Sequence, residues 1–299
     1  MRVLLFFYAL VGRKVLAVFM WPIVAYLYFT GGTSRKASKD YLRRIASKAD
    51  SPQTPSSWQG IKHFYSFALS AFDKIDAWTG RITMAQIESN RPGIFDELVL
   101  KKKGAVFIGS HLGNLEVCRA LSHGRFNTRI NVLVFTQHAV KFNRILHKLN
   151  ANVGVDLIQV AEVGADLAIM LKERIDNGEV VVIVGDRTST TSTGRVSNVE
   201  FLGKSAPFSQ GPFILASLLD CPVYLLFCLK AGNKYRMYFE HLSDSLKFSR
   251  KNRQEELKSV ISQYANRLEY YCLQYPYQWF NFFDFWCDDS NIERNSSTE

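Results

Sequence analysis

Apolar segments typical of strands alternate with amphipathic segments typical of helices between residues 104 and 274, and this alternation constrains the fold most strongly. The strand candidates are GAVFIGS (104–110), NVLVFT (131–136), EVVVIVGDR (179–187), PVYLLFCLK (222–230) and YRMYFEHL (235–242). The helix candidates are 114–124, 140–150, 161–178, 208–221 and 255–274. Apolar strands that alternate with helices predict an α/β fold, with a mostly parallel central sheet flanked by helices on both faces.

The composition is that of a globular protein. Of the 299 residues, 47% are hydrophobic and 21% are charged, which excludes a disordered, collagen-like or coiled-coil chain. The five cysteines (118, 221, 228, 272 and 287) include no CxxC pair, and most lie in apolar runs. We therefore expect reduced core residues rather than disulfides or a zinc module. Residues 35–100 are predicted to be mainly helical, with a loop at SPQTPSSWQG (51–60).

Residues 3–30 are almost wholly apolar and form two runs that Arg13 and Lys14 separate. The second run has 16 residues. As a helix it covers about 24 Å, less than the ~30 Å of a hydrocarbon core, and Pro22 would kink it. We expect a membrane anchor that lies tilted in one leaflet or crosses the bilayer with a kink. A cleavable signal peptide fits less well, because a basic pair and a second apolar run follow the first run. A pair of buried helices in a soluble fold stays open.

Basic residues follow the apolar segment directly. Between residues 35 and 48 the chain carries six basic residues and one acid: Arg35, Lys36, Lys39, Arg43, Arg44, Lys48 and Asp40. Such residues are retained on the cytoplasmic side and attract anionic headgroups. An ordinary solvated helix explains the charges but not their position directly beside the apolar segment. We therefore expect a membrane-associated segment at 1–34, a main domain at 35–288 on the inner face of a membrane, and a polar tail at 289–299.

The strongest chemical signal is SHLGNLE, residues 110–116. The preceding strand places His111 at its carboxyl end, where ligands bind in parallel α/β sheets. Asn114 is a good helix N-cap, which places Glu116 in the first helical turn. This spacing predicts a pair in which Glu116 orients the imidazole and His111 takes a proton from a substrate hydroxyl, although such residues also often only cap a helix. The backbone N–H groups near Gly113 and Asn114 are a candidate oxyanion site.

HLGNLE resembles the His-(four residues)-Glu signature of the lysophospholipid acyltransferase superfamily. It is similar in particular to the late (lauroyl/myristoyl) acyltransferases of lipid A biosynthesis, which commonly carry H-x-G-N-W/L-E. Residues 186–215 resemble that branch's acidic strand end, polar loop, Phe201-Leu202-Gly203 step and Gly-Pro helix. TQHAVKFNRIL (136–146) resembles its second substrate-side block, and YPYQWFNFFDFW (275–286) resembles a subgroup encoded with aryl-polyene pigment pathways. The resemblance covers about residues 35–286.

The resemblance implies an O-acyltransferase on the cytoplasmic face of the cell inner membrane. It would move a fatty acyl group from a thioester, of acyl carrier protein in preference to coenzyme A, to a hydroxyl of a lipid or glycolipid. His111 would be the general base and Glu116 its orienter, with no acyl-enzyme and no cofactor beyond the thioester. The acceptor stays open among a lipid A precursor, a lysophospholipid, glycerol phosphate and a polyene-anchor glycolipid.

Asp186 and Arg187 are expected to face the same crevice, where the guanidinium could bind a phosphate. The lipid A enzymes usually show Asp-Gln-Asp at this strand end. This sequence has Gly185-Asp186-Arg187 at the corresponding position. The difference leaves the role of Asp186 and the assignment to lipid A open. A surface ion pair between Asp186 and Arg187 is the alternative.

Two further substrate contacts are expected, at Gly203 from the resemblance and at Arg144. His138, Lys141 and Arg144 share a helical face at period 3.6, which suits phosphates of a carrier protein or headgroup, or simply an exposed amphipathic helix. The aromatic run 279–286 walls an acyl-chain pocket, lies at the membrane interface, or packs over the core.

Several other classes lack support in the sequence. There is no H-E-x-x-H or paired His/Cys set for a metal, no Walker A or G-x-G-x-x-G for a nucleotide, and Ser110 is not the centre of a G-x-S-x-G. The net charge of +10 comes without a nucleic-acid-binding signature, and much of it lies beside the apolar segment, so no nucleic-acid partner is expected. The remaining alternative is a non-catalytic membrane protein that binds a lipid or scaffolds a biosynthetic complex.

Overall fold

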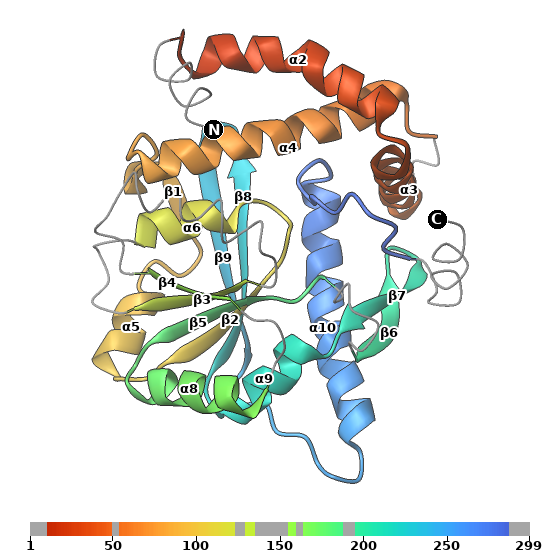
Figure 1. The fold of residues 1–299 in the computed structure, drawn as a ribbon. Helices are drawn as coiled ribbons and strands as arrows, with labels where there is room; N and C mark the ends of the chain where they lie inside the picture. Colours follow the sequence, from red (N-terminus) through yellow and green to blue (C-terminus); the bar gives the residue numbers. More distant parts are fainter. Residues whose placement is uncertain are drawn as a thin grey trace.

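The computed structural model describes residues 11–49, 54–122, 129–134, 155–159, 164–187 and 195–286. Over these residues the chain is an α/β protein with a mostly parallel sheet, as predicted (Figure 1). The sheet has the order β1-β9-β8-β2-β5-β3-β4. Its strands are β1 (Ile87–Ser89), β2 (Ala105–Gly109), β3 (Ile130–Val134), β4 (Val155–Gln159), β5 (Val180–Val184), β8 (Val223–Ala231) and β9 (Lys234–Ser243). Of the described pairs in this sheet, β8–β9 is antiparallel and the others are parallel.

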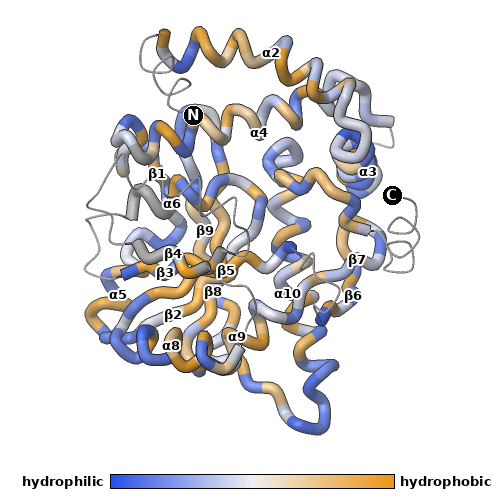
Figure 2. The backbone as a smooth tube through the Cα atoms, viewed as in Figure 1, coloured by the Kyte–Doolittle hydropathy of each residue, from blue (hydrophilic) through white to orange (hydrophobic). Residues whose placement is uncertain are grey.

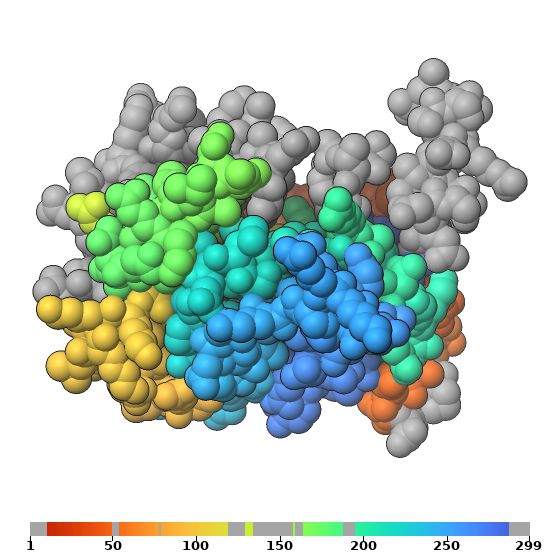
Figure 3. Space-filling view, turned by 90° about the horizontal axis from the view of Figure 1, so that it is seen from below, coloured from red at the N-terminus to blue at the C-terminus, as the bar shows by residue number. Residues whose placement is uncertain are grey.

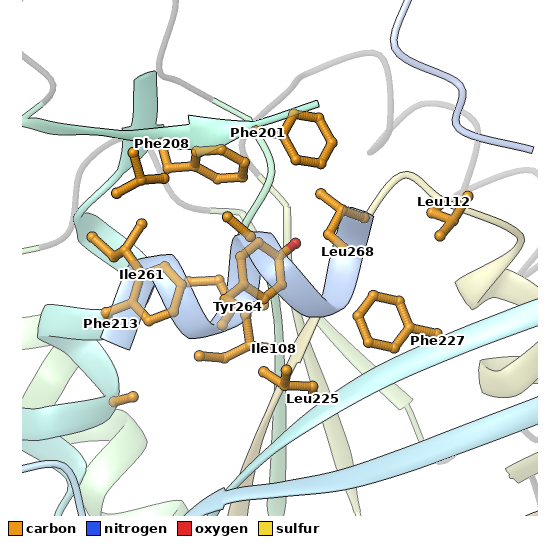
Figure 4. Close-up of a cluster of buried hydrophobic side chains, with 14 of the residues drawn as sticks. Ile108, Leu112, Phe201, Phe208, Phe213, Leu225, Phe227, Ile261, Tyr264 and Leu268 are labelled. Carbon is orange, nitrogen blue, oxygen red and sulfur yellow. The ribbon is translucent and has the colours of Figure 1, made fainter. Parts of the chain in front are cut away.

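The neighbouring strands β2 and β5, near the middle of the sheet, are buried on both faces along almost their whole length, because helices cover the sheet from both sides. Alternate residues of β2 enter different cores: Val106 and Ile108 face α8, α9 and α10, whereas Ala105 and Phe107 face α5 and α6. The helices are α5 (Ile94–Leu100), α6 (Leu115–Ser122), α8 (Ala165–Asp176), α9 (Gly211–Leu219) and α10 (Arg253–Gln274). Figure 4 shows the first of these cores, in which Ile108 lies near Tyr264 of α10. The continuous apolar runs of the sequence reflect this two-sided burial.

An antiparallel hairpin, which the sequence analysis did not predict, lies beside α10 (Figure 1). It consists of β6 (Val196–Phe201) and β7 (Lys204–Ser209). Its two-residue turn has φ angles of 50° at Leu202 and 78° at Gly203, the combination that a tight hairpin turn requires. The hairpin shortens the helix expected at 208–221 to α9. The helix expected at 140–150 lies outside the described residues.

Three N-terminal helices pack against one another outside the sheet: α2 (Arg13–Thr30), α3 (Gly32–Lys48) and α4 (Ser57–Trp78). α4 begins with a capping box between Ser56 and Gln59. α2 lies along α4 (Figure 1). Trp21 stacks on Tyr65 at 4.4 Å between ring centroids. At the far end, the ring of Tyr28 lies over Gly60, where an added Cβ would be 2.4 Å from that ring.

A buried group of charges fixes the start of α2 to α4 and to the sheet. The guanidinium of Arg13 contacts Asp73 and is 2.6 Å from Asp76, both on α4. The ammonium of Lys230, on β8, lies 2.8 Å from Asp73. The Asp73 side chain is only 3% exposed. Charges this deeply buried are tolerated only when they are paired.

We expect Asp73→Ala to destabilise the fold by about 3 kcal/mol or more, because it leaves Arg13 and Lys230 without their shared buried partner. The free energy of unfolding from urea titration measures the loss. Glu88→Ala is the control, because Glu88 pairs with Lys234 and Arg236 on the exposed surface, where ion pairs contribute little. Equal losses in the two variants would contradict this role of Asp73.

Candidate functional site

His111 lies at the carboxyl end of β2, as the sequence predicted, and contacts a carboxylate from the neighbouring strand. β2 and β5 are parallel neighbours with Gly109 opposite Val184, so the residues after each strand meet at one edge of the sheet. The Asp186 Oδ1 is 2.8 Å from Nδ1 of His111. The backbone N–H of His111 donates to Oδ2 of the same carboxylate at 2.8 Å. Asp186 therefore fixes both the backbone and the ring of His111.

Asp186 has no exposed surface and receives a third hydrogen bond. The indole N–H of Trp279 donates to its Oδ2 at 2.8 Å. Burial by itself raises the pKa of the Asp186 carboxyl, but the interaction with His111 and these hydrogen bonds outweigh burial and lower it below its ordinary value. Asp186 is therefore a carboxylate whose acceptor sites point at three N–H groups.

This geometry defines the tautomer of the neutral His111 ring. A carboxylate only accepts hydrogen bonds, so Nδ1 carries the proton and Nε2 carries the lone pair. The His111 side chain is 29% exposed, whereas Asp186 is fully buried. His111 can therefore take a proton from a ligand at Nε2, and the resulting imidazolium would be stabilised by the buried carboxylate.

Glu116 is not the carboxylate that holds Nδ1 of His111. It lies in the first turn of α6, as expected. Nδ1 of His111 is bonded to Asp186, so Asp186 occupies the position beside the imidazole that the sequence analysis gave to Glu116. The spacing rule failed because the partner comes from the neighbouring strand, 75 residues later in the chain.

The backbone N–H groups of Gly113 and Asn114, at the centre of the expected oxyanion site, both donate to other parts of the protein. The N–H of Gly113 donates to the carbonyl of Gln278, and that of Asn114 to the carbonyl of Cys228, each at 2.8 Å. Gly113 has a φ of 79°, and an added Cβ would be 2.0 Å from the Cys228 oxygen. The Asn114 side chain is buried and donates to the carbonyl of Ser70 on α4. Both residues fix the loop in place, and neither N–H is available to a substrate.

The other residues predicted to contact substrate have different outcomes in the structure. Arg187 is exposed, and its guanidinium lies 5.8 Å from the ring centroid of Phe283. The alternative of a surface ion pair with Asp186 does not fit, because Asp186 is buried against His111 and Trp279. Gly203 is the hairpin turn residue described above, which explains a glycine there without a substrate. Arg144 lies outside the described residues.

Trp279 is a residue of the site that the sequence pattern did not single out. Trp279 is fully buried, whereas Phe280, Phe282 and Phe283 of the same run are partly exposed. The segment pairs with the His111 loop: the N–H of Phe280 donates to the carbonyl of His111 at 3.1 Å. Packing over the core, one of the three interpretations of the run, is confirmed for Trp279. No spacing rule distinguishes it from the other aromatic residues around it.

No protein-family model matches this chain, and a search of curated proteins found no match. The described residues contain no group of three or more His, Cys, Asp or Glu side chains that could hold a metal ion. The site is therefore interpreted from its own chemistry, which is that of an oriented imidazole base.

The isosteric change Asp186→Asn tests the buried carboxylate through stability. The pKa of Asp186 is lowered in the folded protein from an ordinary value of 3.8, so its ionised form contributes stability above that pH. This contribution is lost as the pH falls through the folded pKa. We expect the difference in unfolding free energy between wild type and Asp186→Asn to be present above about pH 4 and to shrink as the pH falls further below it. A difference that is independent of pH would contradict this account.

Proposed function

We propose that the protein is an O-acyltransferase that transfers a fatty acyl group from a thioester to a hydroxyl of a lipid or glycolipid. The observation that carries the proposal is the hydrogen-bonded pair of His111 and Asp186 at the carboxyl ends of parallel strands, with Nε2 of the imidazole, which has no hydrogen-bond partner among the described residues, as the base. The resemblance of HLGNLE to the acyltransferase signature supports the choice of reaction.

In the proposed reaction, the acceptor hydroxyl attacks the thioester carbonyl while Nε2 of His111 takes its proton. The C–O bond forms, the C–S bond breaks, and the imidazolium returns the proton to the departing thiolate. The reaction therefore balances as ester plus thiol, without a covalent enzyme intermediate. The positive charge that develops on His111 lies 2.8 Å from the Asp186 carboxylate, which stabilises the transition state relative to the ground state.

Arg187 supports an anionic substrate. It follows Asp186 directly, yet it is exposed and stacks on Phe283. A guanidinium held on an aromatic ring keeps its donors available for a phosphate. The phosphate would belong to the acceptor headgroup or to the phosphopantetheine arm of acyl carrier protein or coenzyme A. We propose acyl carrier protein as the donor, on the resemblance alone.

The outer face of α2 supports attachment to a membrane, on the cytoplasmic side of the inner membrane in our proposal. α2 is the one helix of the described residues that is long and apolar enough to cross a bilayer. Seven of its large apolar side chains are exposed: Val15, Val18, Phe19, Ile23, Tyr26, Leu27 and Phe29. Figure 2 shows this apolar helix at the edge of the molecule. Lys14, Arg35 and Lys36 are exposed at its two ends, as suits anionic headgroups.

We favour a position in the plane of the membrane for α2. The helix contacts α4 from Arg13 through Trp21 to Tyr28, so one side is already occupied by protein. The opposite side would enter the headgroup and acyl boundary. A lipid acceptor would then reach His111 from the layer that carries α2 and α4.

Acyl transfer by the purified protein tests the reaction. We expect His111→Ala and Asp186→Asn each to lower turnover by about 10²–10⁴-fold, because one removes the base and the other reverses its tautomer. His241→Ala is the control, because His241 is an exposed residue of β9 that pairs with Asp244. The assay offers labelled thioesters of acyl carrier protein and of coenzyme A with total inner-membrane lipid. Near wild-type turnover in His111→Ala would refute the mechanism.

Vesicle binding tests the membrane face. We expect the double variant Phe19→Ser/Tyr26→Ser to bind anionic phospholipid vesicles about tenfold or more weakly, because two exposed rings no longer leave water. The matched control is Leu100→Ser/Ile169→Ser on α5 and α8, where the side chains are at least as exposed, at 84% and 69%. Figure 3 shows this other side of the molecule, where α5, α8 and α9 form the surface. Equal weakening by both double variants would refute the assignment.

A further inference from the structure

A second histidine is fully buried, and a single residue, Trp279, connects it to the candidate pair of His111 and Asp186. His63 of α4 has no exposed surface. Its Nε2 is 2.9 Å from the carbonyl oxygen of Trp279. Its Nδ1 is 2.9 Å from the hydroxyl of Ser38 on α3. The same Trp279 donates its indole N–H to Asp186. His63 thus holds the backbone of Trp279, and the Trp279 side chain holds the Asp186 carboxylate.

The protonation state of His63 follows from these partners. The Trp279 carbonyl only accepts, so Nε2 carries the proton and Nδ1 accepts from the Ser38 hydroxyl. Burial lowers the pKa of His63 to about 4, against a smaller opposing effect of the Trp279 hydrogen bond. His63 therefore stays neutral at physiological pH and keeps one fixed tautomer.

Trp279 can transmit position because it is rigid. Its ring is enclosed by aromatic neighbours, with centroids 5.0 Å away at Tyr41, 5.3 Å at Phe201 and 5.1 Å at Phe285. Side chains in such close-packed surroundings occupy one rotamer. A shift of the Trp279 backbone would therefore move the indole N–H relative to Asp186.

We propose that the Ser38–His63 pair is a positioning device that sets the Trp279 indole against Asp186, and through Asp186 the orientation of His111. The hydrogen bonds run from Ser38 through His63, Trp279 and Asp186 to His111. His63 touches no reacting atom in this arrangement. The kinetic part of this inference rests on the proposed acyl transfer, whereas the structural part does not.

A purely packing role explains the position poorly. His63 lies among the rings of Tyr41 and Phe282, at 5.4 Å and 4.7 Å between centroids. An apolar side chain would fill this space without the cost of burying two ring nitrogens. The imidazole instead has both nitrogens bonded, one to a residue 216 positions away in the chain. This pairing connects the helical layer of α3 and α4 to the edge of the sheet.

Two substitutions of the full-length protein separate positioning from packing. His63→Leu removes both hydrogen bonds, and His63→Gln keeps an N–H donor within reach of the Trp279 carbonyl. The first readout is hydrogen exchange of the Trp279 indole N–H by NMR, with the resonance assigned by its loss in Trp279→Phe. The second is turnover, separated into kcat and KM.

We expect His63→Leu to speed exchange of the indole N–H and to lower kcat about tenfold or more with little change in KM, since small misplacements at a catalytic pair are costly. We expect His63→Gln to restore both to within about threefold of wild type, because it keeps the donor. Unchanged indole exchange in His63→Leu would overturn the proposal, as would equal losses in both variants. If wild type transfers no acyl group, the proposed function fails, and the exchange measurement still decides the positioning role.

Discussion

The site depends on one buried charge, the carboxylate of Asp186. A carboxylate without solvent is costly unless each oxygen is paired. Here the backbone and ring of His111 and the indole of Trp279 supply the donors. The same three bonds fix the tautomer and direction of the imidazole. The hydrogen bonds that offset the cost of burying Asp186 are therefore also the bonds that orient the imidazole of His111.

Separate parts of the chain meet at this carboxylate. Asp186 follows shortly after the end of β5, His111 follows shortly after the end of β2, and the segment after α10 supplies Trp279. Parallel pairing places the first two at one sheet edge. The third is held by pairing with the His111 loop and by His63 of α4. The layer of α2 and α4, which we propose as the membrane face, is thus connected to the site through hydrogen bonds as well as packing.

The sequence predicted the parts of this arrangement that depend on local pattern. Periodicity located the central strands, and the residues after β2 identified His111. A spacing rule within one segment does not predict a pair that forms between two neighbouring strands. Glu116 was therefore given the position beside Nδ1 of His111 that Asp186 occupies in the structure. The free N–H groups expected at Gly113 depended on a loop whose donors are used by a distant segment. Trp279 gave no distinct signal, because its role depends on where the chain places it and not on its neighbours in sequence.

In the arrangement described here, neutral His111 carries its proton on Nδ1, toward Asp186, and keeps the lone pair on Nε2. Nitrogen-15 NMR of the full-length protein, with the His111 signals assigned by their loss in His111→Ala, measures the tautomer directly. We predict a protonated Nδ1 and an unprotonated Nε2 in the neutral ring. A neutral ring protonated on Nε2 would contradict it, because Asp186 would then not orient a base.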